Sequence, residues 1–252
     1  MDNSYLEKVI SLTKNGLYNE NDPIYITAHR GVTSYAPENT LPAYEKSVEL
    51  GYYTAECDIR LTKDGVWVLH HNGDLDIFGE EGTIEDHTYE ELCSYKYVRG
   101  ANCDMEGLKI CTLDEYLDVF VGTKTRPQIE IKTETYDTLG TVVDAVVKKG
   151  MAEQSIVISF DLEQLRIIHN LNPAIELWYL VGKITPECIA EAKALSDKVW
   201  LSPCYDDNDD ESITLALKEK IGVSFWTVNT VEDAKRLYDL GVRYIETDIL
   251  CK

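Results

Sequence analysis

Two stretches of the sequence decide the fold: residues 24–31 read IYITAHRG, and residues 53–71 read YTAECDIRLTKDGVWVLHH. Each stretch opens with a short apolar run rich in β-formers, and a helix-like segment separates the two, which is the pattern of a βα unit. Further runs of the same kind follow, again with helix-like segments between them. The eight strands predicted in this way cover residues 24–28, 53–59, 128–132, 156–160, 175–181, 198–202, 222–228 and 244–248.

Eight βα units in 252 residues predict an α/β protein with a closed (β/α)8 barrel, the TIM barrel. Helix caps support this reading. Asp161 begins one helix, with Gln164 at the capping-box position, and Thr230 begins another that ends at Gly241. An open doubly wound sheet would need a glycine-rich phosphate loop after its first strand, and the sequence has none there. No low-complexity linker divides the chain, so we predict a single domain over residues 1–252.

The second half of the longer stretch, VWVLHH, reads as one more strand, and it follows the second barrel strand too closely for a parallel crossover. We therefore predict a β-hairpin, with Asp64 and Gly65 as a two-residue turn. This register sets Asp58 opposite His71 on one face of the ribbon. It sends His70 to the other face, where a structural role is expected.

The composition restricts the partners and the location. The formal net charge of −21 repels nucleic acids and anionic membrane surfaces, so neither is expected as a partner. No stretch approaches the ~18 apolar residues of a membrane span, and the N-terminus has no signal-peptide pattern. Seven cysteines without metal-binding spacing favour reduced thiols in a cytoplasmic protein. A short amphipathic helix covering the bottom of the barrel is predicted from Leu6, Val9, Ile10, Leu12 and Leu17.

Reactive side chains of such a barrel gather at the carboxyl ends of its strands. The first strand ends just before a histidine and an arginine, and the next two carry charged residues at every second position, hence on one face. The hairpin returns a second histidine to the same level. The residues expected to meet there are His29, Arg30, Glu56, Asp58, His71, Glu130 and Lys132.

These residue types predict phosphodiester chemistry. The three carboxylates suit one hard divalent cation, Mg²⁺ or Ca²⁺. The two histidines titrate near neutral pH and suit a general acid and a general base. The arginine and the lysine offset phosphate charge. Trp226, in the seventh strand, is expected to form a wall of the substrate pocket.

Nine short motifs, in a fixed order, extend this reading over nearly the whole chain. They are His29-Arg30-Gly31, Ala36-Pro37-Glu38-Asn39-Thr40-Leu41, Glu56-x-Asp58, Leu61-Thr62-Lys63-Asp64-Gly65, Val68-x-x-His71, Ile129-Glu130-Ile131-Lys132, Ser159-Phe160, Phe225-Trp226-Thr227-Val228-Asn229 and Thr247-Asp248. In this order they closely resemble the signature of the glycerophosphodiester phosphodiesterase family.

The resemblance implies a barrel with a small insertion, at about residues 73–110, and hydrolysis of glycerophosphodiesters to glycerol 3-phosphate and an alcohol. One departure is Asn72, which stands where the family usually has Asp, so His71 is expected to be a weaker base. The roles implied are metal ligation by Glu56, Asp58 and Glu130, acid–base catalysis by His29 and His71, and phosphate binding by Arg30 and Lys132.

Two alternatives stay open. One is a phospholipase acting on lysophospholipids or other phosphodiester lipids, although the acidic run 79–82 suits a lipid surface poorly. The other is a non-catalytic phosphodiester-binding protein. The sequence does not decide the head alcohol, the metal, the nucleophile (water or the substrate's own hydroxyl), which histidine is the acid, or whether the chain forms a homo-oligomer.

Overall fold

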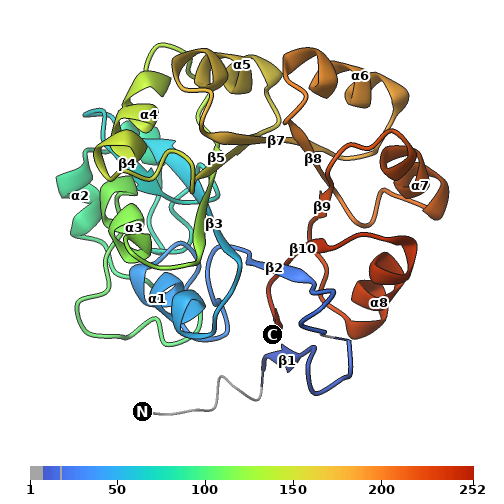
Figure 1. The fold of residues 1–252 in the computed structure, drawn as a ribbon. Helices are drawn as coiled ribbons and strands as arrows, with labels where there is room; N and C mark the ends of the chain where they lie inside the picture. The colour runs from blue at the N-terminus through green and yellow to red at the C-terminus, as the bar shows by residue number, and fades with distance from the viewer. Residues whose placement is uncertain (1–7, 18) are drawn as a thin grey trace.

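A ring of eight parallel strands, surrounded by helices, forms the computed structural model, which describes residues 8–17 and 19–252 (Figure 1). The hydrogen-bonded order is β8-β7-β6-β5-β3-β2-β10-β9. Parallel bridges from Leu201 to Val223 and from Cys204 to Trp226 join β8 to β9 and close the ring. The predicted (β/α)8 barrel is therefore confirmed. Its strands are β2 (Tyr25–Ala28), β3 (Thr54–Leu61), β5 (Arg126–Ile131), β6 (Ile156–Ser159), β7 (Glu176–Val181), β8 (Trp200–Pro203), β9 (Ser224–Phe225) and β10 (Tyr244–Thr247).

The outer helices begin and end at the predicted capping residues, but one predicted capping interaction does not form. Thr230 accepts a hydrogen bond from the backbone N–H of Asp233, and Gly241 closes that helix at a φ of 106°. Gln164 does not complete a capping box, because its amide instead bonds Ser159 and the backbone carbonyl of Thr133, in the loop that follows β5. The outer helices are α1 (Leu41–Glu49), α3 (Leu113–Phe120), α4 (Leu139–Lys148), α5 (Leu162–Leu171), α6 (Pro186–Leu195), α7 (Asp210–Lys218) and α8 (Val231–Leu240).

The hairpin forms, but its predicted register is wrong by one residue. Strand β4 (Trp67–Leu69) pairs antiparallel with β3, and Ile59 lies opposite Leu69. The backbone N–H of Gly65 bonds the carbonyl of Thr62, and Gly65 has a φ of 80°, so the loop has three residues and not two. A glycine in the left-handed region at the end of such a loop absorbs one extra residue, which shifts every pair after it.

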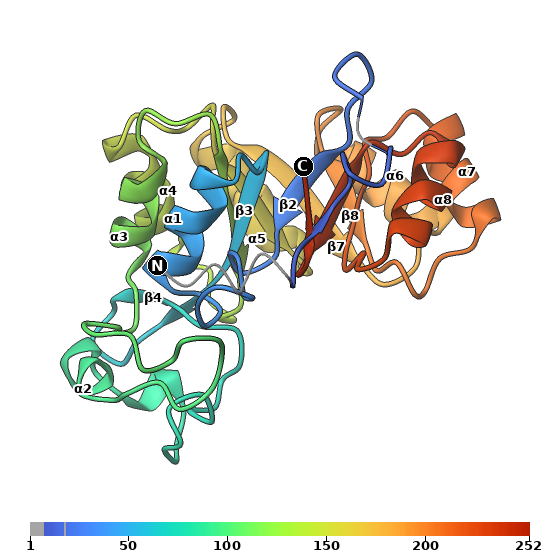
Figure 2. The ribbon, with the colours of Figure 1, turned by 90° about the horizontal axis from the view of Figure 1, so that it is seen from below.

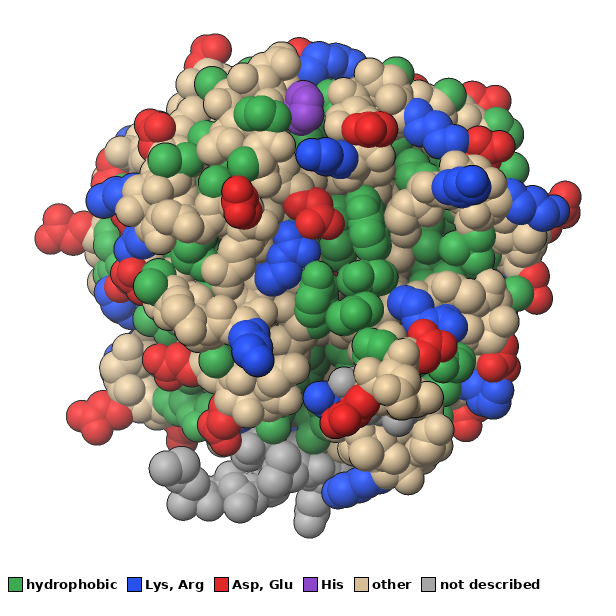
Figure 3. Space-filling view, in the orientation of Figure 1, with side chains coloured by type: hydrophobic (Ala, Val, Ile, Leu, Met, Phe, Trp, Pro, Cys, Tyr) green, Lys and Arg blue, Asp and Glu red, His purple; other side chains and the backbone are tan. Residues whose placement is uncertain are grey.

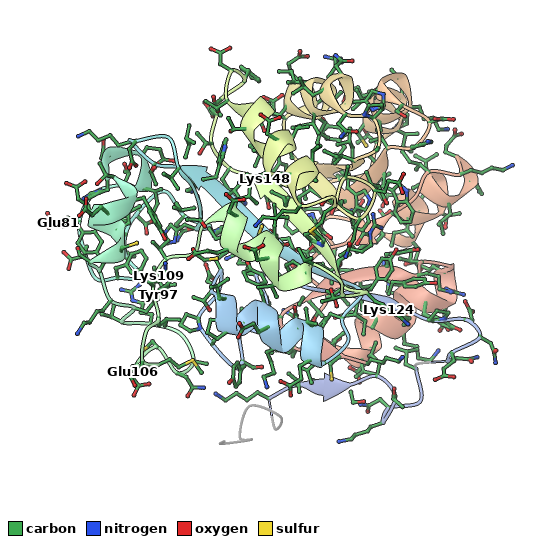
Figure 4. The ribbon with its side chains drawn as sticks, turned by 60° about the vertical axis from the view of Figure 1, so that its left-hand side comes forward. Glu81, Tyr97, Glu106, Lys109, Lys124 and Lys148 are labelled. Atoms are coloured by element: carbon green, nitrogen blue, oxygen red, sulfur yellow. The ribbon has the colours of Figure 1, made fainter. Side chains whose placement is uncertain are left out.

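Residues after the hairpin form an insertion at one end of the barrel (Figure 2). It contains the helix α2 (Tyr89–Cys93) and a short 3-10 helix, Ile84–Asp86. Glu81 and Glu106 lie on its outer side, away from the barrel (Figure 4). The insertion has an apolar cluster of its own, formed by Val68, Leu75, Phe78, Ile84, Leu92, Tyr97 and Ile110.

Residues 8–17, the described part of the N-terminal segment, do not form the predicted amphipathic helix. Ile10 and Ser11 form strand β1 (Ile10–Ser11), which pairs in parallel with β11 (Leu250–Cys251). Leu12 follows and is fully buried. A helix over these residues would give up the backbone hydrogen bonds to the C-terminal strand, which explains why the apolar spacing misled the prediction. Leu6, which belonged to that prediction, lies outside the described residues.

Three further expectations concern membrane spans, the cysteines and the location of the protein. None of the helices in the described residues is long and apolar enough to pass through a membrane. All seven cysteines are free thiols, as expected. The cytoplasmic location stays a prediction.

Candidate active site

Three carboxylates meet where strands β3 and β5 end. Asp58 lies level with Glu130 on the neighbouring strand, and Glu56 stands two residues before Asp58 on the same face. One oxygen from each of the three lies within 4.8 Å of the others. All three side chains are buried, since Glu130, the most accessible of them, is only 8% exposed.

Packing three acids together changes their protonation. Burial, followed by the charge of Asp58, raises the pKa of Glu56 well above its ordinary value. Burial and Asp58 also raise the pKa of Glu130 to about 7. Burial acts in the same direction on Asp58, but Lys132 and Arg30 outweigh it and hold the pKa of Asp58 at about 2. The three acids therefore carry less than their full charge near neutral pH when no cation is bound.

This donor set fits a divalent cation. Glu56 Oε1 and Asp58 Oδ1 are buried and have no hydrogen-bond partner within the described residues. Buried acceptors without partners are costly, and the like charges of the acids repel one another. Both costs fall when a hard cation binds carboxylate oxygens, so Glu56, Asp58 and Glu130 can hold Mg²⁺ or Ca²⁺.

Two cationic side chains border the carboxylates. Arg30 has a φ of 58°, and its backbone N–H donates to Glu56 Oε2 at 2.9 Å. Its guanidinium lies 3.3 Å from Asp58 Oδ2 and donates to Glu38 at 3.1 Å. The ammonium of Lys132 lies 2.6 Å from Glu130 Oε1 and 3.3 Å from Asp58 Oδ1. Both cations are thus fixed beside the place where a phosphate oxygen would meet a bound metal.

His29 lies between two carboxylates. Its Nδ1 is 2.7 Å from Asp248 Oδ1, and its Nε2 is 3.8 Å from Glu246 Oε1. Asn229 donates to the other oxygen of Asp248 at 2.7 Å and so fixes that carboxylate. Burial lowers the pKa of His29, but the hydrogen bond that its ring donates to Asp248 and the charge of Glu246 outweigh burial, and the pKa is raised. His29 therefore keeps its proton to a higher pH than an ordinary histidine does.

His71 has the opposite environment. It is half-buried, and its Nδ1 lies 2.9 Å from the amide oxygen of Asn72. Burial lowers its pKa, and the attraction of Asp58 does not compensate. His71 thus stays in the field of the carboxylates, although the pairing predicted for it is wrong: the backbone N–H of His70 is what bonds Asp58 O, at 2.9 Å. The imidazole of His70 bonds a backbone carbonyl of the insertion, which supports the structural role expected for it.

Trp226 follows strand β9 and is partly buried. Its indole N–H donates to the carbonyl of Ser202 at 2.8 Å, and its ring packs on the apolar cluster inside the barrel. The edge of the ring meets Phe160, with centroids 6.0 Å apart and planes at 85°. Trp226 therefore fills the barrel and also supports an exposed aromatic ring.

The profile of the glycerophosphoryl diester phosphodiesterase family matches residues 29–250. The chain belongs to this family. The prediction of the family is thereby confirmed, and the match spans every motif quoted above for the resemblance.

Other members of the family are similar over most of their length. A glycerophosphodiester phosphodiesterase of Bacillus subtilis (strain 168) is 28% identical, covering 97% of this chain and 90% of that protein. One from Caldanaerobacter subterraneus is 30% identical, covering 88% and 93%. Among solved structures, a phosphodiesterase of Oleispira antarctica in complex with the product sn-glycerol-3-phosphate superposes with a TM-score of 0.81 at 23% identity, covering 95% and 96%. That likeness supports the fold.

Three residues that support the site were not among the site residues predicted from the sequence. Asn39 has a φ of 57° and donates to Asp58 Oδ2 at 2.9 Å. Glu246 and Asp248 flank His29, and Glu246 also forms a second acidic group with His29 and Glu56. A signal was present, because Glu246 and Asp248 stand two apart at the end of the last strand, as Glu56 and Asp58 do at the end of β3.

Proposed function

We propose that the protein hydrolyses glycerophosphodiesters to glycerol 3-phosphate and an alcohol, with a divalent cation held by Glu56, Asp58 and Glu130. The observation that carries the proposal is the group of buried carboxylates, with two oxygens lacking partners, bordered by Arg30 and Lys132. Family membership supports the same reaction. The homologues from Bacillus and Caldanaerobacter are named for it.

The bound cation would supply charge that polarises a phosphoryl oxygen and attracts the anionic substrate. Arg30 and Lys132 bind the other phosphoryl oxygens and stabilise the charge that develops in the transition state. Both are already fixed by carboxylates, so little reorganisation is needed when substrate binds.

The two histidines divide the proton transfers. His71, whose pKa is lowered, is neutral near pH 7 and takes the proton from the attacking oxygen. His29, whose pKa is raised, donates its Nε2 proton to the oxygen of the leaving alcohol as the P–O bond breaks. Asp248 holds the His29 ring through Nδ1, which leaves Nε2 directed toward the carboxylate group. The attacking oxygen belongs to water, which gives glycerol 3-phosphate directly, or to the substrate's own glycerol hydroxyl, which gives a cyclic phosphate that water then opens to glycerol 3-phosphate.

The test is release of glycerol 3-phosphate from glycerophosphocholine, glycerophosphoethanolamine and glycerophosphoglycerol, with Mg²⁺, Ca²⁺ or EDTA. We expect turnover that EDTA abolishes and that His29→Ala reduces by at least ~10²-fold. His169→Ala is the matched control, since His169 lies on α5 and lines a cavity at the opposite end of the barrel. Turnover that survives EDTA, or an equal loss in both histidine variants, contradicts the proposal.

A further inference from the structure

A cavity adjoins the carboxylate group. It has a volume of about 580 Å³, within the usual range for small-molecule sites. Glu130 and Lys132 of the proposed active site form its inner end. From there it runs outward between the loops that follow strands β5 and β6. The lining residues that matter here are Glu130, Lys132, Glu134, Tyr136, Phe160 and Asp161.

Two aromatic rings that line this cavity are exposed, in contrast to the other phenylalanines of the described residues. Phe160 is 54% exposed and Tyr136 is 49% exposed, whereas Phe78, Phe120 and Phe225 are buried. Trp226 holds Phe160 from behind through an edge contact. Exposed rings fixed at the wall of a cavity offer their free surface to a ligand.

The outer part of the cavity is negative. The hydroxyl of Tyr136 donates to Asp161 Oδ2 at 2.7 Å, and this bond and the charges of Asp161 and Glu134 raise the pKa of Tyr136. Glu134 is exposed, and no cation pairs with it among the described residues. Lys132 is the basic residue of the lining, and it is held at the inner end by Glu130 and Asp58.

We propose that this outer part, formed by Glu134, Tyr136, Phe160 and Asp161, binds the cationic head alcohol of the substrate, a choline- or ethanolamine-type ammonium group. The proposal rests on the function proposed above and names the substrate class of the same site. Ammonium groups are attracted by the faces of aromatic rings and by carboxylates, and both line the outer part. Only two carbons separate the phosphate from the nitrogen in such esters. A phosphate bound at Lys132 would lie at the inner end of this cavity, so the nitrogen can reach the outer part, and an anionic head group would be repelled from it.

The test compares glycerophosphocholine with its neutral isostere, in which a 3,3-dimethylbutyl group replaces choline, and with glycerophosphoglycerol. The isostere has the same shape without the charge, so the ratio of the two kcat/KM values isolates recognition of the cation. We expect a ratio of about 10 for the wild-type protein, a typical value for a cation on a partly exposed aromatic and acidic site.

Two variants locate the effect. Glu134→Gln and Phe160→Leu should each lower the ratio to about 3 or less, since each removes one part of the attraction. Glu153→Gln is the matched control, because Glu153 is exposed and lines the cavity at the opposite end of the barrel. This control should leave the ratio unchanged.

The outcomes are distinct. Turnover of all three substrates with a ratio near 1, or a ratio that neither variant lowers, overturns the cationic subsite and leaves the phosphodiesterase function intact. No release of glycerol 3-phosphate from any substrate overturns the proposed function and the subsite with it. A wild-type ratio near 10 that falls in both variants and persists in the control supports the subsite.

Discussion

The two ends of the barrel are built from the same strands but contain different chemistry. At the end where the strands finish, buried acids, two histidines and two cations meet, and several pKa values are shifted. At the other end, which faces the viewer in Figure 3, hydrophobic side chains line a central hollow. A cavity of about 700 Å³ opens there. The aromatic residues at that end are Tyr25, Tyr53, Trp178, Trp200 and Tyr244.

The carboxylate of Glu176 at the aromatic end is fully paired, whereas two carboxylate oxygens at the acidic end accept no hydrogen bond. Arg126 pairs with Glu176 at 2.7 Å, and the indole N–H of Trp178 donates to the same carboxylate at 2.8 Å. Glu56 Oε1 accepts no hydrogen bond within the described residues, and Asp58 Oδ1 has the ammonium of Lys132 at 3.3 Å but accepts no hydrogen bond. The comparison indicates that one end stabilises the barrel, while the other carries unfavourable electrostatics that a ligand relieves.

The largest expected effect comes from comparing one substitution at each end of the barrel. Glu56→Gln should lower kcat/KM by at least ~10³-fold, because it removes a metal-binding charge. The urea midpoint of the metal-free protein should stay unchanged or rise, because one of the repelling acids is gone. Glu176→Gln should do the reverse, with normal kcat/KM and a lower midpoint from loss of the pair with Arg126. Loss of activity in both variants would remove the distinction between the ends.

A stability effect of about 3 to 5 kcal/mol is expected for Trp178→Ala. Trp178 is fully buried and stacks on Trp200 with ring centroids 5.3 Å apart, so truncation leaves a large cavity and an unpaired Glu176 oxygen. Urea unfolding measures the loss. The kcat/KM of the folded fraction should stay within about twofold of wild type. Phe160→Ala is the opposite control, because that ring is exposed and its loss should leave the unfolding free energy nearly unchanged. A large stability loss in Phe160→Ala would contradict the comparison.

The stability of the metal-free protein should fall between about pH 5 and pH 7. The folded pKa of Glu130 is about 7, above its ordinary value of 4.5, so the folded state binds more protons than the unfolded state in this range. The unfolding free energy therefore decreases as the pH rises, by about 3 kcal/mol for this group, and levels off above pH 7. Urea unfolding in EDTA at several pH values measures it. Glu130→Gln should flatten the curve, and a wild-type curve that rises through this range would contradict the pKa direction.

The smallest expected effect concerns Asn72→Asp. A carboxylate beside Nδ1 would raise the pKa of His71, which the amide now leaves lowered. If His71 acts as the base in its neutral form, the acid limb of the kcat/KM profile moves to higher pH, by about one unit. The kcat/KM value then decreases at pH values below the new pKa of His71 and increases slightly at higher pH. A limb that does not move would exclude His71 as the group that sets it.

Much of this arrangement was predictable from local sequence. Alternation along β3 and β5 placed Glu56, Asp58 and Glu130 together, because side chains two apart share a face and neighbouring parallel strands end at one level. The same rule, applied to the last strand, would have added Glu246 and Asp248. The hairpin register was not predictable from the turn residues alone, since Asp64-Gly65 suits both a two-residue loop and the three-residue loop that forms.

The sequence by itself determined the family, the order of the strands and the residue types at their ends, because these depend on short-range patterns in the chain. Only the tertiary structure decided how those residues are paired. Closure of the ring brings β10 beside β2, and it is this contact that places Asp248 and Glu246 against His29. The resulting protonation states depend on burial and on charges from distant parts of the chain, which no local pattern contains.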